Sequence, residues 1–227
     1  MSDIAIPVGG HGGGEVHSHP KFLQHHFHTA KQQFEASKLG MWLFLVTEIL
    51  LFSGLFLGYF ILQSKHPQAF IEAHHHLDRN LGLINTVVLL ISSFTMVMAV
   101  QSAALSRTKA TLAFLYTTMA LGGTFMVIKY FEYLHKIHEG LLPGSLFSYA
   151  EAKVPGEYLF FSMYFMMTGV HGIHIIAGMA VIAYLIFRTH KGDYSSRYYT
   201  PVDLTGLYWH LVDLIWIYLF PLLYLVS

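Results

Sequence analysis

Paired ionisable side chains inside apolar runs are the chemically informative feature of this 227-residue chain. The run "TGVHGIHIIAG" carries His171 and His174, and the run "GLYWHLVDLIWIYLF" carries His210 and Asp213, each pair three residues apart. Residues at positions i and i+3 share one face of a helix. An ionisable group within an apolar helix is costly unless it faces protein or a water-filled space. The two pairs therefore predict polar contacts between neighbouring helices, or a site for a proton or an ion.

Three further helices carry polar groups within apolar runs. Glu48 lies roughly 15 Å along the run that begins at Leu39, which is near the middle of a bilayer. Its carboxyl group is predicted either to transfer protons or to form a hydrogen bond across a helix interface. The other residues of this kind are Asn85 and Thr86 in the second run, and Lys129 and Glu132, a predicted i, i+3 ion pair, in the third.

Metal binding is the main chemical alternative for the histidines, because histidines on two helices can hold a haem or a metal ion. Two ligands at i and i+3 on one helix, however, point into the same small volume. A haem with two axial histidines takes one ligand from each side, and a di-metal carboxylate site needs Glu-x-x-His on two helices. The chain has no cysteine, which excludes thiolate-bound copper and iron–sulfur clusters. We predict no metal site in this chain.

Composition and hydropathy predict an all-α, polytopic membrane protein with five transmembrane helices. Hydrophobic residues make up 54% of the chain and charged residues only 11%, whereas soluble domains carry about 25% charged residues. Each apolar run exceeds the roughly 20 residues that cross a bilayer, and backbone groups in lipid must be satisfied within a helix. The net charge of zero gives no sign of a nucleic-acid surface. The expected spans are 39–63, 81–105, 111–136, 157–187 and 204–226.

The distribution of basic residues predicts the orientation of these spans. The N-terminal segment and the loops after the second and fourth spans carry eight Lys and Arg residues, and the opposite side carries four. By the positive-inside rule, the N-terminus lies in the cytoplasm and the C-terminus on the opposite, outer side of the membrane.

The domain organisation predicted is a flexible, Gly- and His-rich segment over residues 1–38, followed by one transmembrane domain over 39–227. The histidines of this segment and of the loop His74–His76 could bind zinc or copper ions, although a solvated tail and loop explain them more simply. Small residues on the fourth helix, Gly169, Gly172 and Gly178, are predicted to allow a neighbouring helix to approach closely.

Five motifs together resemble subunit III of the haem–copper respiratory oxidases, in its five-helix bacterial form. They are "LGMWLFLVTEILLF", "INTVVLL", "KYFEY", "TGVHGIHIIAGM" and "LYWHLVDLIWIYLF", which occur in the family's order over about residues 36 to 226. One departure is Lys129, because some members carry Gln before the glutamate of "KYFEY". A second departure is Gln101 and Ser102, where some members carry His after the second helix.

The resemblance implies an accessory subunit that has no haem or copper of its own and packs against oxidase subunits I and II, which hold those cofactors. It implies bound phospholipid, stabilisation of the catalytic subunit and support for its proton uptake, in a complex that reduces O₂ to water. The family's intramembrane acid falls on Glu48. Its other polar positions fall on Asn85, Thr86, Glu132, His171, His174, His210 and Asp213.

By this interpretation, His210 and Asp213 tie the last helix to its neighbours, with His171 and His174 as candidate partners. Two alternatives stay open at the level of sequence. One is a stand-alone proton or ion transporter that uses Glu48 and the paired histidines, and the other is a membrane cytochrome that binds its own haem. The electron donor of the complex, cytochrome c or quinol, cannot be read from this chain.

Overall fold

The computed structural model describes residue 27 and residues 29–143, 146–148, 154–196 and 198–225. Five of the helices in these residues are long and apolar enough to cross a membrane, which confirms the predicted fold class. The helices are α1 (Ala30–Lys65), α2 (Pro67–His74), α3 (Arg79–Ala104), α4 (Thr108–His138), α5 (Glu157–His190) and α6 (Thr200–Tyr224). The histidines of the N-terminal tail lie outside the described residues.

The helices extend past most of the expected span limits. α1 begins at Ala30 instead of Leu39, so the last residues of the segment expected to be flexible are helical. The sequence AKQQFEASK has good helix formers but few apolar residues, and hydropathy therefore marks the membrane span and not the end of the helix. The short helix α2 was not predicted, because its eight residues are fewer than a span requires.

The ends of the helices follow ordinary capping chemistry. The Asp78 side chain accepts hydrogen bonds from the backbone amides of Asn80 and Leu81 at 2.8 and 3.3 Å, which starts α3. Prolines occupy the first turns of α2 and α6, where a missing N–H is harmless. Gly140 and Gly192 follow α4 and α5 with φ of 77° and 76°, a backbone region that favours glycine.

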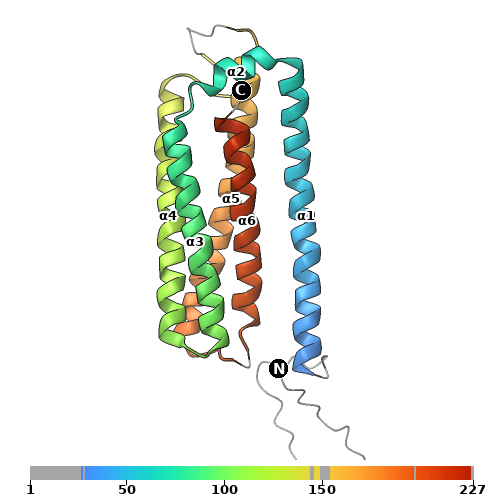
Figure 1. The fold of residues 1–227 in the computed structure, drawn as a ribbon, viewed down its shortest axis with the longest axis vertical. Helices are drawn as coiled ribbons and strands as arrows, with labels where there is room; N and C mark the ends of the chain where they lie inside the picture. The colour runs from blue at the N-terminus through green and yellow to red at the C-terminus, as the bar shows by residue number, and fades with distance from the viewer. Residues whose placement is uncertain (1–26, 28, 144–145, 149–153, 197, 226–227) are drawn as a thin grey trace, which may run out of the picture. The chain divides into compact units, whose positions relative to one another are not determined.

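The chain divides into two units, Met1–Thr47 and Glu48–Ser227, with the boundary inside α1. In the first unit, the described residues from Ala30 to Thr47 form the N-terminal part of that helix. In the second unit, α3 packs against α4 and α6, and α5 packs against α4 and α6, so these four helices form a bundle (Figure 1). The helix α2 crosses one end of the bundle and packs on α5.

From Glu48 onward, α1 reaches the bundle through long side chains. The Tyr59 hydroxyl donates to the Leu222 carbonyl oxygen of α6 at 2.6 Å. The Phe52 ring meets the His174 ring of α5 edge-on, with centroids 5.2 Å apart. Tyr59 also packs edge-on against Phe70 of α2, at 5.1 Å between centroids. Aromatic and polar side chains thus make these contacts.

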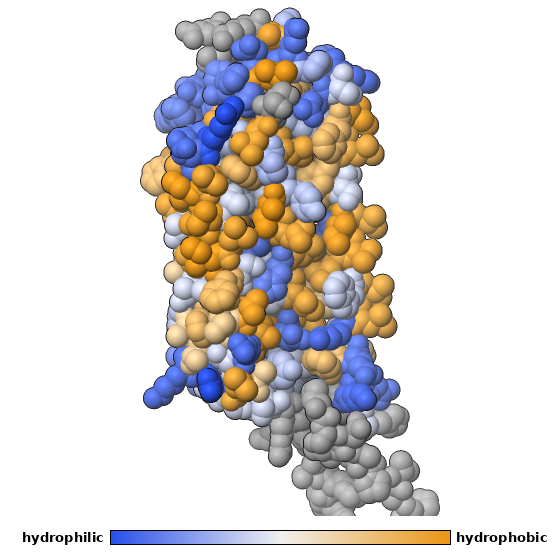
Figure 2. All heavy atoms as spheres, viewed as in Figure 1, coloured by the Kyte–Doolittle hydropathy of each residue, from blue (hydrophilic) through white to orange (hydrophobic). Residues whose placement is uncertain are grey.

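Polarity within the bundle is the reverse of that in a soluble protein. Many large apolar side chains are exposed, and Figure 2 shows hydrophobic residues over the middle of the molecule with hydrophilic residues gathered toward its two ends. Charged and polar side chains such as Lys129, Glu132, Asn85 and Asp213 are buried between the helices. This arrangement suits a lipid bilayer, where apolar side chains can face outward and polar groups must find partners inside the bundle.

Gly178 is the glycine of α5 that permits close packing. A Cβ atom at this position would lie 2.8 Å from the ring of Trp209, which occupies the space between α4, α5 and α6. The expectation for Gly169 and Gly172 was wrong, since a Cβ at Gly169 would lie 3.9 Å from its nearest neighbour and one at Gly172 would meet nothing within 4 Å. The space at Gly178 is filled by an indole ring and not by a helix backbone.

Candidate functional site: polar groups inside the helix bundle

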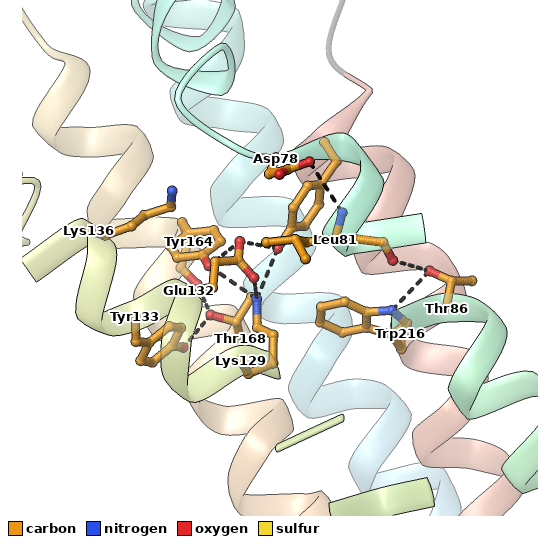
Figure 3. A network of polar contacts seen from close by, with 12 residues as sticks. Asp78, Leu81, Thr86, Lys129, Glu132, Tyr133, Lys136, Tyr164, Thr168 and Trp216 are labelled. Carbon is orange, nitrogen blue, oxygen red and sulfur yellow. Dashed lines mark hydrogen bonds and ion pairs between the residues drawn. The ribbon is translucent and has the colours of Figure 1, made fainter. Parts of the chain in front are cut away.

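A buried ion pair on α4 is the centre of the largest polar cluster. The Lys129 ammonium group lies 2.9 Å from Glu132 Oε2, and both side chains are nearly excluded from solvent (Figure 3). The predicted i, i+3 ion pair is therefore confirmed. Lys129 also donates to the hydroxyl oxygens of Tyr164 at 3.1 Å and Tyr224 at 2.9 Å.

Both tyrosines complete the cluster by donating to the same carboxylate. Tyr164 and Tyr224 donate to Glu132 Oε1 at 2.9 and 2.6 Å. The ammonium group thus has three acceptors for its three hydrogens, and the carboxylate has three donors. A buried ion pair is favourable only when its remaining hydrogen-bonding capacity is met in this way. We call these four residues the lysine cluster. Because they belong to α4, α5 and α6, the cluster joins three helices.

Further hydrogen bonds extend from the lysine cluster. Thr168 donates to the Tyr164 carbonyl oxygen, which leaves its own oxygen to accept from the Tyr133 hydroxyl at 2.5 Å (Figure 3). Lys136, about two turns after Lys129 on α4, donates to the backbone oxygen of His76 at 2.8 Å. The loop between α2 and α3 is thereby attached to α4.

Glu48 and His174 form a second polar contact, between α1 and α5. Glu48 Oε2 lies 2.7 Å from His174 Nε2, and His174 Nδ1 lies 2.7 Å from the Val170 carbonyl oxygen. A carbonyl oxygen can only accept, so His174 Nδ1 carries a proton. The short distance to Glu48 then requires a second proton between the two side chains, either on the carboxyl group or on Nε2. The Tyr208 hydroxyl donates to the His174 carbonyl oxygen at 3.0 Å.

A series of hydrogen bonds runs along the seam between α3 and α6. The Trp216 indole donates to Thr86 at 3.1 Å. One to two turns away, Trp209 donates to Ser92 at 2.9 Å, and His210 Nδ1 lies 2.7 Å from the Ser93 hydroxyl. His210 therefore contacts α3, and the expectation that it contacts His171 or His174 was wrong. A serine within an apolar helix gives too weak a sequence signal to predict this pairing.

Three predicted polar residues have no hydrogen-bond partner among the described residues. They are Asn85 on α3, His171 on α5 and Asp213 on α6, and both polar atoms of each side chain are unpaired and buried. The His171 ring packs against Phe125 and Trp216, with centroids 5.6 and 5.2 Å away. Ser93 is a polar neighbour of the Asp213 carboxyl group without reaching hydrogen-bond geometry. The predicted residues therefore do not form one site.

His74, the first residue of the histidine loop His74–His76, is held by hydrogen bonds to neighbouring residues. His74 Nδ1 donates to the Ile71 carbonyl oxygen at 2.5 Å, and Arg79 donates to Nε2 at 3.0 Å. An arginine donor requires a neutral imidazole, so the ring holds its proton on Nδ1. Burial, together with the nearby Arg79 guanidinium, lowers the pKa of His74. Within the described residues, no three His, Cys, Asp or Glu side chains gather as metal ligands.

Sequence comparison assigns the family. The family model for cytochrome c oxidase subunit III matches residues 14–227. The chain belongs to the cytochrome c oxidase subunit III family. It is therefore a multi-pass membrane subunit of a respiratory oxidase complex, as the motifs predicted.

The relatives of this subunit III include both kinds of oxidase. The quinol oxidase subunit 3 of Bacillus spizizenii is 32% identical over 189 residues, which cover 83% of this chain and 86% of the relative. The cytochrome c oxidase subunit 3 of a Synechocystis species is 33% identical over 215 residues, covering 94% and 81%. The cytochrome bo(3) ubiquinol oxidase subunit 3 of Buchnera aphidicola is 29% identical over 192 residues, covering 85% and 92%.

Proposed function

We propose that this subunit III is a non-redox accessory subunit that stabilises the haem- and copper-bearing catalytic subunit and supports its proton uptake through Glu48. The observation that carries the proposal is the 2.7 Å contact between Glu48 and His174. An acid within a span is functional by default when it faces protein. The contact holds a proton inside an apolar helix pair, as a group that exchanges protons must do.

The exposure of the Glu48–His174 pair also fits proton exchange. Glu48 lies on α1 and His174 on α5. Their side chains retain slight exposure, 15% for Glu48 and 16% for His174. A group that is wholly sealed could not exchange a proton, and a fully exposed one would not need a partner. Partial exposure therefore suits a proton-exchanging group.

The test replaces Glu48 with Gln in the intact oxidase complex. The complex is placed in lipid vesicles, and its proton uptake is measured during turnover. We expect haem content and subunit composition to be unchanged, while the rate of proton uptake falls. Ser53→Ala is the matched control on the same helix, because its exposed hydroxyl donates only to the Ile49 carbonyl oxygen of its own helix. Proton uptake at the wild-type rate in Glu48→Gln would refute the role of Glu48.

Membrane orientation and lipid binding are part of the same proposal. The N-terminus is cytoplasmic, the C-terminus is periplasmic, and phospholipids cover exposed apolar side chains such as Phe94 and Ile173. Because the chain has no cysteine, single cysteines can report its orientation. Lys109→Cys is expected to react with a membrane-impermeant thiol reagent only from the cytoplasmic side, and Gln68→Cys only from the periplasmic side. The reverse pattern would overturn the orientation.

A further inference from the structure

Six buried polar atoms at the centre of the bundle have no partner among the residues that the structure describes. They belong to Asn85, His171 and Asp213, whose side chains are 0%, 0% and 3% exposed. Leaving such a group without a partner costs roughly 1–3 kcal/mol for a neutral group, and more for a charged one. Three cases in one bundle point to a partner that is not a protein side chain.

The printed contacts place these three residues within a short length of the bundle. Asp213 is three residues after His210, which contacts Ser93, and three before Trp216, which bonds Thr86. Asp213 therefore lies between two cross-links of the α3–α6 seam. Asn85 directly precedes Thr86 in the sequence, and the His171 ring packs on Trp216.

We propose that Asn85, His171 and Asp213 line an internal water site between α3, α5 and α6. The three side chains do not bond one another, so a bridging molecule must supply both donors and acceptors. Asparagine presents donors and an acceptor, a neutral histidine presents one of each, and a carboxyl group accepts and, when protonated, also donates. Water meets this mixed set, because a buried water makes about three hydrogen bonds in either role.

A metal cation is a poorer occupant of the same site. A cation would use only the amide oxygen of Asn85 and one ring nitrogen of His171, and it would leave the amide hydrogens and the imidazole N–H unpaired. Within the described residues, moreover, no three His, Cys, Asp or Glu side chains gather as metal ligands, so His171 and Asp213 have no third ligand of these types. The water site does not depend on the role proposed for Glu48, which contacts His174 and not these three residues.

Hydroxyl-radical labelling of the intact oxidase complex tests the proposal. Radicals made by an X-ray pulse in H₂¹⁸O arise from bound as well as bulk water, so buried residues beside an internal water gain ¹⁸O. Phe125 packs on His171, whereas Phe160 packs on Phe70 and Phe161, and both phenylalanines are buried, at 1% and 0% exposure. We expect Phe125 to be labelled several-fold more than Phe160.

Two substitutions locate the water. Asp213→Leu and Asn85→Leu remove ligands of the site, and each is expected to lower Phe125 labelling toward the level of Phe160. Thr117→Ala is the matched control, because that exposed hydroxyl donates only to Ala113 of its own helix. If one substituted chain fails to assemble, the other and the wild-type comparison still decide. Equal, low labelling of Phe125 and Phe160 in the wild-type complex would overturn the proposal.

Discussion

The lysine cluster and the centre of the bundle treat buried polar groups in opposite ways. In the cluster, the Lys129 ammonium group donates to three oxygens, and the Glu132 carboxylate accepts from three donors. Tyr164 belongs to this cluster. His171, seven residues further along α5 and thus about two turns away, has no hydrogen-bond partner for either nitrogen in the described part of the chain. A saturated network fixes the positions of the helices that supply it, whereas an unsaturated one binds something else. The first region is suited to assembly and the second to a ligand.

The lysine cluster should give the largest effect when it is broken. Lys129→Met leaves the Glu132 carboxylate buried without its cation, and we expect a loss of about 3–5 kcal/mol in the free energy of unfolding of this subunit. Denaturant titration of the purified complex, with proteolysis of the unfolded fraction of this subunit as the readout, measures it. The double variant Lys129→Met, Glu132→Leu is expected to recover part of that loss, because the uncompensated charge is gone. A double variant as unstable as the sum of both single changes would show that charge pairing is not the cause.

Packing around Trp209 should give the next largest effect. Gly178→Ala would bring a methyl group within 2.8 Å of the indole ring, which is rigid, and overpacking of this kind costs typically 1–3 kcal/mol. The change would also disturb the seam that borders the unsaturated centre, through the bond from Trp209 to Ser92. Gly172→Ala on the same helix is the control, since its methyl group meets nothing within 4 Å. Similar stability losses for the two variants would contradict the packing described for Gly178.

The cross-link between Ser93 and His210 marks the boundary of the unsaturated centre. Ser93→Ala removes one partly buried hydrogen bond and should cost about 1 kcal/mol, the usual net value of such a bond. The same denaturant titration measures it. If the loss is undetectable, His210 must have another partner, such as water from the neighbouring site.

The smallest expected effect is the pH dependence of the His74 contact. The pKa of His74 is lowered in the folded chain, so the unfolded chain binds the extra proton more readily. Stability from this contact is fully present above the unfolded pKa of about 6.5 and decreases as the pH falls below it. The stability of the complex between pH 7.5 and 5.5 should therefore fall less in His74→Gln than in the wild type. An identical pH dependence would show that His74 does not titrate in this range.

The sequence predicted the spans well because lipid imposes a simple rule of length and hydropathy. It also predicted the Lys129–Glu132 pair, since both groups lie on one face of one helix. The partners Tyr164 and Tyr224 were missed, because a tyrosine in a span resembles the many that anchor a helix at the membrane interface. Ser93 was missed for a similar reason. Contacts between helices depend on how the helices are rotated and aligned, which a pattern within one helix does not specify.

The role of the whole chain is tested most directly by a reduced-minus-oxidised absorption spectrum of the complex that co-purifies with a tagged copy. The spectrum is repeated after a stronger detergent has stripped this chain from its partners. We expect haem bands in the first preparation, and after stripping we expect them to remain with the partner subunits. Haem that follows this chain would contradict the account of a non-redox subunit and would make His171, His174 and His210 candidate ligands.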